Sequence, residues 1–597
     1  MGHAYQAVGW NPAKKRYDKT LLQCVLAGLV TFGGITALLR PDSTAETILI
    51  RSFGFVAFAL LHVILSIGPL CRLDARFLPL LYNRRHMGVT MFFCALAHGT
   101  LSFVLYHALG VISPLESLFL GDSGGVGIAG IPFQPLGAFA LAILFLMAAT
   151  SHDFWLRNLT APVWKTLHML VYAAYGMLVM HVALGYLQSN DSATAPIVVL
   201  LGMAWLIGVH LAAARKEALN DRPARAQANG AFVDVCSIDD VPEKGARTAM
   251  VAGERVAVFR YDGCVSAVSS VCKHQNGPLG EGRIQDGCIV CPWHGYQYRP
   301  QDGRAPSPFT ETLPTFGVKV EAGRVLVASK PNAPGTHVEP ARVEGAGKQP
   351  DGDFYVGYGS GPSTAQSRFS RRVVVRAFAV CIAALALLAA TQRQLRDSRF
   401  EFGVVRAFTG KVEMTPYPVL RVARPNGGAS AWMLVAPGKH GADDLVQQFA
   451  GRAITLRGSL IHQGERTMIE VEPGSVTPLD AAASSAIPSV QIQRHGRMTL
   501  RGEIVDSKCH LGVMNPGERR THRACAKLCI RGGIPPMLWC EDKDGNVRRL
   551  LLVDLDGRAV NDRVVELVGD PVEMDGDVTQ IDDILLLRID PALIRRL

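Results

Sequence analysis

Long apolar runs alternate with short polar segments over the first third of the chain. Six of these runs can cross a bilayer as helices, because about 20 residues at about 1.5 Å per residue span its hydrocarbon core. They lie at residues 21–39, 48–70, 87–110, 133–149, 163–187 and 196–213. We therefore predict an α-helical membrane bundle at residues 21–214, preceded by a cytoplasmic tail at residues 1–20.

The polar segments between the runs alternate in charge. Lys and Arg gather in the N-terminal tail and in every second segment after it, at residues 72–85, 157–165 and 215–225. The intervening segments hold few or no basic residues, at 40–50, 111–131 and 188–195. Because basic loops stay in the cytoplasm, we expect a multi-pass protein of the cell membrane. Its N-terminus and the chain just after residue 214 would both face the cytoplasm.

Beyond the bundle the pattern changes to short runs in which apolar and polar residues alternate, which is typical of β-strands. We predict an all-β domain and two further β-rich, small barrel-like domains, at residues 229–330, 400–477 and 496–597. Linkers are expected at residues 215–228 and 331–367.

A seventh apolar run separates the first of these β domains from the other two. It covers residues 371–392, and arginines flank it on both sides. As a membrane helix it would carry the C-terminal domains to the outer face, with Arg376 reaching back to the cytoplasmic surface. A buried helix of a soluble domain is the alternative.

Composition supports the membrane interpretation. Hydrophobic residues make up 49% of the 597 residues and charged residues 19%, with a formal net charge of +10. The basic residues flank apolar runs or are scattered through the β-rich parts, and no dense basic run is interleaved with aromatic residues. We therefore expect a lipid bilayer as partner and no nucleic acid.

Histidines within the apolar runs are candidate functional groups, because a ring nitrogen in hydrocarbon needs a partner. His98 lies about 16 Å along the third run and His181 about 26 Å along the fifth, at about 1.5 Å per residue. These two runs cross the membrane in the same direction, so the two rings can face each other across a porphyrin. His168 lies about 20 Å from His181, toward the cytoplasm.

The sequence around these histidines resembles the ferric-reductase-like transmembrane family. The similar segments are NRRHMGV at 83–89, Ala97–His98, TSHD at 150–153 and WKTLHMLVY at 164–172, followed by His181. The resemblance covers about residues 50–190 and implies b-type haem held by His98, His168 and His181. A second haem is left open, because Arg84 stands near where two-haem members carry another histidine. His62 is a substitute ligand for that second haem.

A second motif lies in the first β domain. Cys272 and His274 form a C-x-H pair, and after 16 residues Cys291 and His294 form a C-x-x-H pair. Four such ligands could hold zinc, but zinc pairs usually leave two or more residues between ligands. A Rieske [2Fe–2S] centre uses two thiolates on one iron and two imidazoles on the other.

The context of the motif resembles the Rieske family. Both cluster loops are present with their glycines, as CKHQNGPLGEG at 272–282 and GCIVCPWHGYQY at 287–298. Gly277 and Trp293 occupy the positions of the loop disulfide of respiratory Rieske proteins. The domain is therefore similar to Rieske ferredoxins and oxygenase Rieske domains, and a cytoplasmic location suits the missing disulfide. We interpret Cys288 as a strand thiol.

Two functions that often accompany a Rieske centre lack support in the sequence. An oxygenase needs a separate iron site, usually of two histidines and a carboxylate, and the later histidines show no such spacing. No G-x-G-x-x-G opens a helix after a strand, so no nicotinamide or flavin site is indicated.

The last β-rich domain contains Cys509, Cys525, Cys529 and Cys540. Cysteines in an exported domain most often form disulfides. A metal site of Cys509, His522, Cys525 and Cys529 is the alternative.

We predict an electron-transfer oxidoreductase that moves single electrons between a cytoplasmic [2Fe–2S] cluster and haem b, towards an acceptor at the outer face. The donor would be a separate soluble reductase or ferredoxin, and the acceptor quinone, a metal ion or an exported protein. Two alternatives are a quinol-oxidising module running electrons inward and a non-enzymatic membrane redox sensor. No residue is assigned a catalytic role.

Overall fold

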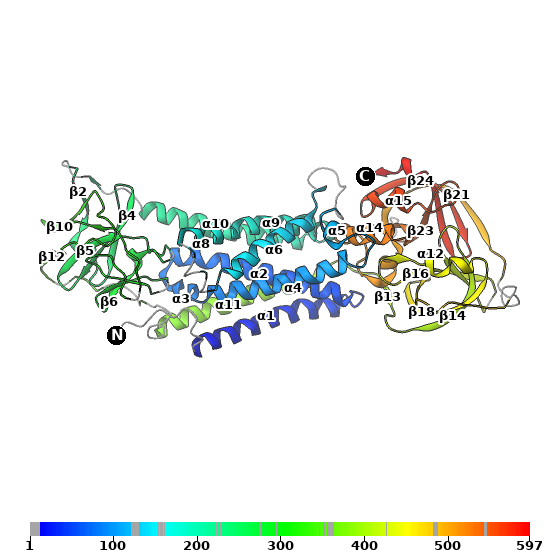
Figure 1. Cartoon of the computed structure of the whole chain (residues 1–597), viewed down its shortest axis with the longest axis horizontal. Coiled ribbons are helices and arrows are strands. Elements are labelled where there is room, and N and C mark those ends of the chain that lie inside the picture. Colours follow the sequence, from blue (N-terminus) through cyan, green and yellow to red (C-terminus); the bar gives the residue numbers. More distant parts are fainter. Residues whose placement is uncertain are drawn as a thin grey trace.

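The chain folds into an elongated molecule with a helical bundle in its middle and β domains at both ends (Figure 1). One β domain, residues 225–349, lies at one end of the bundle, and two more, residues 399–478 and 492–597, lie at the other. We call them the first, second and third β domains. The computed structural model describes residues 12–120, 130–152, 155, 159, 161–220, 225–226, 230–274, 276–293, 295–307, 309–345, 347–349, 354, 363–425, 427–480, 488–541 and 546–597.

Among the described residues, the bundle contains six helical spans long and apolar enough to cross a membrane, and a shorter apolar helix, α6. These confirm the predicted six helices and the seventh. The fifth span is broken at Leu170 into two helices, α8 and α9. The helices are α1 (Pro12–Leu39), α2 (Ala45–Leu73), α4 (Arg84–His107), α6 (Phe133–Ala149), α8 (Ala161–Met169), α9 (Val171–Leu184), α10 (Thr194–Asn220) and α11 (Thr364–Ala390). Short elements η1 (Ala75–Phe77), α3 (Leu78–Leu81), α5 (Pro114–Leu120) and η3 (Leu187–Ser189) lie between them.

Several helices are longer than their apolar runs. Helix α1 begins at Pro12, before the apolar run, and Lys14 there lies 5.3 Å over the ring of Tyr82. Lys and Arg favour helix, so a helix continues past the bilayer core into the polar interface, where a long basic side chain is accommodated. Hydropathy alone therefore places helix ends too close to the apolar run.

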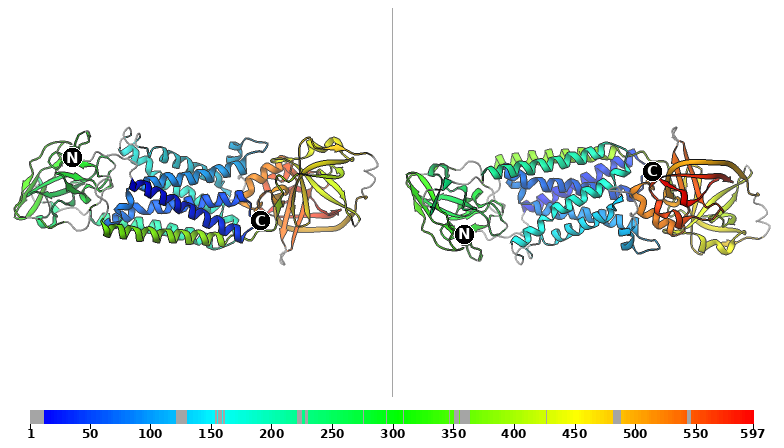
Figure 2. Two further views of the ribbon diagram at one scale, coloured as in Figure 1. Left: turned by 90° about the horizontal axis from the view of Figure 1, so that it is seen from below. Right: turned by 90° about the horizontal axis from the view of Figure 1, so that it is seen from above.

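Helix α11 joins the bundle although about 150 residues separate it from α10. Leu385, Leu388 and Ala389 are buried in the same core cluster as Leu61 and Leu144. Figure 2 shows α11 beside α1 in both views. At its last residues the Arg40 guanidinium donates to the carbonyls of Ala390, Gln392 and Arg393, which satisfies acceptors that a helix end leaves unpaired.

The first β domain is built from three small antiparallel sheets. Two of them run in the orders β1-β2-β11-β10 and β12-β5-β4-β3, with β9 added to β5, and the third is β6-β7-β8. The strands are β1 (Arg225–Ala226), β2 (Phe232–Ser237), β3 (Ala246–Val251), β4 (Glu254–Tyr261), β5 (Cys264–Ser269), β6 (Arg283–Gln285), β7 (Cys288–Val290), β8 (Gln297–Tyr298), β9 (Thr315–Phe316), β10 (Val318–Glu321), β11 (Arg324–Ala328) and β12 (Ala341–Arg342).

The second β domain is a closed five-stranded barrel in the order β14-β15-β16-β19-β18, in which β18 pairs again with β14. Strands β16 and β19 are parallel, and α12 (Asp443–Val446) lies between β16 and β18. This is the topology of an OB-fold. The strands are β13 (Arg399–Phe400), β14 (Arg406–Glu413), β15 (Val419–Ala423), β16 (Ala429–Ala436), β17 (His440–Gly441), β18 (Ala453–Gln463), β19 (Arg466–Val471) and β20 (Thr477–Pro478).

The third β domain repeats this topology in the order β21-β22-β23-β25-β24, closed by β24 on β21, with β23 and β25 parallel. Its strands are β21 (Ile492–Asp506), β22 (Pro536–Glu541), β23 (Val547–Val553), β24 (Pro571–Ile581), β25 (Ile584–Ile589) and β26 (Arg595–Arg596), with α15 (Asn561–Val564) before β24. Between β21 and β22 it carries an insertion with η7 (Cys509–Val513), η8 (Arg520–His522) and α14 (Arg523–Arg531).

The insertion makes contacts between the third β domain and the bundle. Arg519 forms an ion pair of 2.6 Å with Asp191, in the loop before α10. Arg520 donates to the carbonyl of Ile131. The second β domain is joined to the third by a buried ion pair of 2.8 Å between Arg421 and Asp582.

Candidate electron-transfer sites

The two cluster loops of the first β domain have the same backbone design. The amide of Cys272 donates to the carbonyl of Gly277, five residues on, and its own carbonyl accepts from the amide of Asn276. Cys291 repeats both bonds at the same spacing, with Tyr296 and Gly295. Asn276 and Gly295 both have positive φ, at 56° and 68°, which lets each loop turn sharply around its cysteine.

The loops bring the two cysteines together inside the domain. Cys272 and Cys291 are each 1% exposed, whereas His274 is only partly buried and stacks on the ring of Tyr296. The Tyr298 hydroxyl lies 3.5 Å from Cys272 Sγ. Two buried thiols and a more exposed imidazole suit a cluster whose histidine-bound iron lies at the surface. His294, the fourth predicted ligand, lies outside the described residues.

The loops touch through the residues that replace the respiratory disulfide. A Cβ on Gly277 would lie 2.6 Å from Cys291 Sγ and 3.3 Å from Cγ of Trp293. The indole therefore covers the glycine and holds the loops together by packing. Burial raises the pKa of the neighbouring Cys288 thiol. Because the thiolate is the reactive form, this agrees with the interpretation of Cys288 as an unreactive strand residue.

Within the bundle, His98 and His181 face each other across a cavity of about 440 Å³. Their ring centres lie 6.1 Å apart with the ring planes perpendicular. His98 Nδ1 bonds to the carbonyl of Ile50 and His181 Nδ1 to that of Phe133, both at 2.8 Å. A metal-binding histidine commonly donates one ring N–H to a carbonyl in this way, which leaves Nε2 for the metal.

The other intramembrane histidines have different surroundings. His168 is not among the residues that line this cavity; it stacks on Trp164 and its Nδ1 bonds to that residue's carbonyl. His62 Nε2 lies 3.1 Å from the Tyr175 hydroxyl, and His86 lies 2.7 Å from Asp18. Among the sequence-predicted haem ligands, the structure thus brings together His98 and His181, and His168 lies apart.

Comparison with known proteins identifies both parts. Residues 231–317 match the family model of the Rieske [2Fe-2S] domain, and residues 53–179 match that of the ferric reductase like transmembrane component. The ferredoxin component of the alkene monooxygenase system of Xanthobacter autotrophicus is 33% identical over 101 residues, which are 17% of this chain and 83% of that protein. The chain belongs to the Rieske [2Fe–2S] family.

Two more proteins similar to the Rieske domain are ferredoxins. The 3-phenylpropionate/cinnamic acid dioxygenase ferredoxin subunit of Photorhabdus laumondii is 34% identical over 95 residues, 16% of this chain and 90% of that subunit. The solved ferredoxin of carbazole 1,9a-dioxygenase from Nocardioides aromaticivorans is 26% identical over 17% of this chain and 99% of its own, with a TM-score of 0.16. By its family matches and its curated relatives, the protein is a Rieske ferredoxin-type domain fused to a ferric reductase-like membrane domain.

The Rieske domain is fastened to the bundle at one end of α10. Arg255 of the Rieske domain forms a 2.9 Å ion pair with Glu217 of α10. The preceding Lys216 donates to the carbonyls of Arg72 and Leu73, at the end of α2. The domain thus contacts the bundle at the end opposite the two barrels (Figure 1).

The glycines and carbonyl groups that contact His98 and His181 were not identified from the sequence, although their regular spacing from the two histidines could have indicated them. A Cβ on Gly54 would lie 2.9 Å from His98 Nδ1, and one on Gly137 would lie 2.7 Å from His181 Nδ1. Each glycine follows the carbonyl residue, Ile50 or Phe133, by four residues and precedes its histidine by 44. The two halves of the site therefore repeat one pattern, which a search for internal repeats can find.

Proposed function

We propose that the protein carries single electrons across the membrane between a Rieske cluster and a b-type haem, towards an acceptor at the outer face. The Rieske and ferric reductase-like domains already indicate a membrane electron-transfer protein. The observation that carries the finer proposal is the facing pair of His98 and His181, within a bundle that has the Rieske domain at one end.

The cluster would be held by residues of the two loops. Cys272 and Cys291 would bind one iron, and His274 and His294 the other. The burial of both cysteines and the partial exposure of His274 support this division. An imidazole edge near the surface gives an electron a short route to a partner.

His98 and His181 would hold the haem between them through their ring nitrogens, and the haem would supply one-electron transfer. Two metal–nitrogen bonds of about 2 Å, added to half the width of each ring, separate the ring centres by about 6 Å. The separation of 6.1 Å matches this requirement. The carbonyls of Ile50 and Phe133 would keep the proton on Nδ1 of each ring.

His168 stays a predicted ligand of a second group nearer the Rieske domain. Two axial histidines saturate one haem iron, so His168 cannot serve the same one. Its Nε2 is buried and finds no hydrogen-bond partner among the described residues. That nitrogen is available to a ligand.

The distribution of basic residues supports the proposed orientation of the electron path in the membrane. The Rieske domain follows the basic end of α10, and by the positive-inside rule that end lies in the cytoplasm. The donor would then be a soluble reductase or ferredoxin, since the related domains are the ferredoxin components of larger systems. The acceptor would be quinone, a metal ion or an exported protein.

The proposal is tested by reduced-minus-oxidised optical spectra and low-temperature EPR of the purified chain. We expect a haem b Soret band, and a Rieske signal from the same sample. His98→Ala and His181→Ala should each lose most of the haem band and keep the Rieske signal. His210→Ala, a control in which the lost ring contacts Tyr172, should keep both. Unchanged haem bands in both ligand variants would overturn the assignment.

A further inference from the structure

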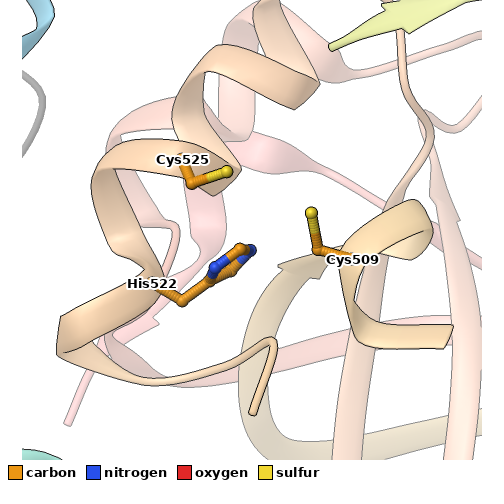
Figure 3. A group of neighbouring side chains, drawn as sticks. All are labelled: Cys509, His522 and Cys525. Atoms are coloured by element: carbon orange, nitrogen blue, oxygen red, sulfur yellow. The ribbon is translucent and has the colours of Figure 1, made fainter. Parts of the chain in front are cut away.

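The insertion of the third β domain buries a cluster of thiols beside a histidine. Cys509, Cys525 and Cys529 are 4%, 2% and 1% exposed and belong to one core cluster. They come from η7 and α14, and His522 immediately precedes α14. The side chains of Cys509, His522 and Cys525 point towards one another (Figure 3).

The ligand atoms are close enough for a single ion. One ligand atom from each of Cys509, His522 and Cys525 lies within 4.8 Å of the others. Cys529 Sγ lies within the same distance of Cys509 Sγ and of a carboxylate oxygen of Asp506. Ligands of a tetrahedral ion with sulfur bonds of about 2.3 Å lie about 3.8 Å apart. Small side-chain movements therefore complete the site.

His522 is oriented as a metal ligand. Its Nε2 lies 2.8 Å from Oδ2 of Asp506, a fully buried carboxylate, while its Nδ1 has no hydrogen-bond partner among the described residues. The other oxygen of Asp506 accepts from the Cys509 amide at 2.8 Å. A carboxylate behind a histidine fixes which ring nitrogen is left for a metal. The histidine is 1% exposed, so leaving its Nδ1 buried without a hydrogen bond or a metal would cost free energy.

The thiols do not form the two pairs that four cysteines in an exported domain suggest. Cys509, Cys525 and Cys529 form no disulfide within the described part of the chain. Cys540 is buried in a different core cluster, with Ile504 and Leu550. A disulfide between two of the remaining three would leave one thiol and His522 Nδ1 buried beside it.

We propose that Cys509, Cys525, Cys529 and His522 bind one thiophilic metal ion, for which Zn²⁺ is the best match. Three thiolates and one imidazole are a structural zinc set, and a buried site with no open position is typical of a structural ion. Soft thiolates also suit Cu⁺. Three thiolates leave the zinc site one negative charge in excess. The buried Lys439 offers a nearby cation, because its Nζ and Cys525 Sγ both approach the carbonyl of Leu105.

The ion would shape the part of the insertion that meets the membrane domain. Thr521, next to His522, lines the cavity of His98 and His181 and donates its amide to Ser189 Oγ. Arg519 and Arg520 make the other contacts to the bundle. The site would therefore hold the segment that contributes Thr521 to the lining of the cavity.

The test is the metal content of the intact chain in detergent, purified without metal chelators. We expect about one equivalent of zinc or copper per chain in addition to iron, and mass spectrometry of the two elements tells them apart. Cys525→Ser and His522→Ala should each reduce this to below a fifth. Cys540→Ser, a control in the other core cluster, should keep it. The Rieske EPR signal, from a distant domain, reports that each variant chain is made with its Rieske domain folded, and it does not depend on haem binding.

A second measurement needs no variant. After mild metal removal, Co²⁺ should restore one equivalent and give intense thiolate-to-cobalt charge-transfer bands. Absence of any metal except iron, before and after adding Zn²⁺, would overturn the proposal. So would a disulfide between any two of the three cysteines in the purified chain, detected by non-reducing peptide mapping. Loss of the haem spectrum alone would count only against the proposed electron path.

Discussion

At the scale of single residues, His98 and His181, the proposed haem ligands, are positioned by groups that carry no redox chemistry. Gly54 and Gly137 allow the rings to lie directly against the helices α2 and α6, and two backbone carbonyls orient them. Each hydrogen bond also satisfies a ring nitrogen that would be costly to leave unpaired within the bundle.

This arrangement predicts that Gly54→Ala and Gly137→Ala each displace a histidine. Contacts of 2.9 Å and 2.7 Å with Nδ1 leave no room for a methyl group, so the ring has to shift. Overpacking costs about 1–3 kcal/mol, and we expect a several-fold lower ratio of Soret to protein absorbance. Gly176→Ala on α9 is a matched control, because its Cβ would meet nothing within 4 Å. Equal haem content in all three variants would contradict the account.

At the scale of elements, the cluster loops and the helices were accessible to sequence reasoning to different degrees. The C-x-H and C-x-x-H spacings identify the two loops, because both pairs are surrounded by the glycines that allow a chain to turn sharply. The helices follow from apolar length. By contrast, hydropathy does not indicate the break between α8 and α9 or the extra turns of α1. The pairing of His98 with His181 depends on how each helix is rotated about its axis, which the sequence does not give.

The Rieske loops predict a strong effect of a small substitution. In Gly277→Ala the new methyl group would lie 2.6 Å from Cys291 Sγ, so the thiol has to move. We expect at least a fivefold loss of Rieske EPR intensity per chain. Gly317→Ala, whose Cβ would make an ordinary 3.5 Å contact with Ala328, should keep the full signal. If Gly277→Ala also keeps it, the packing of the two loops does not support the cluster.

The barrels show what a pattern of alternation leaves undetermined. It correctly indicates two small β-rich domains, but strand order and closure depend on long-range pairing. The parallel contact of β23 with β25 is an example. The cysteines illustrate the same limit: Cys540 and Cys529 are 11 residues apart, yet they belong to different core clusters. Which thiols meet is decided by the face of the helix or strand on which each lies: Cys529 is on α14 and Cys540 on β22.

At the scale of the whole molecule, one chain places a Rieske domain and two barrels at opposite ends of an apolar bundle (Figure 1). The bundle cavity lies towards the barrels, since Thr521 of the third β domain contributes to its lining. On the proposed path, electrons from the Rieske domain would travel most of the length of the bundle, and His168, at the end of α8, would lie along this path.

The most direct test of this path is stopped-flow reduction of the purified chain. A soluble reductant too large to enter the bundle reduces the Rieske cluster, and the Soret band and the Rieske EPR signal of freeze-quenched samples are followed together. The account predicts that haem is reduced after the cluster and that Cys272→Ser abolishes haem reduction while the haem is still bound. Haem that stays oxidised beside a fully reduced cluster, or is reduced equally fast in Cys272→Ser, would contradict it.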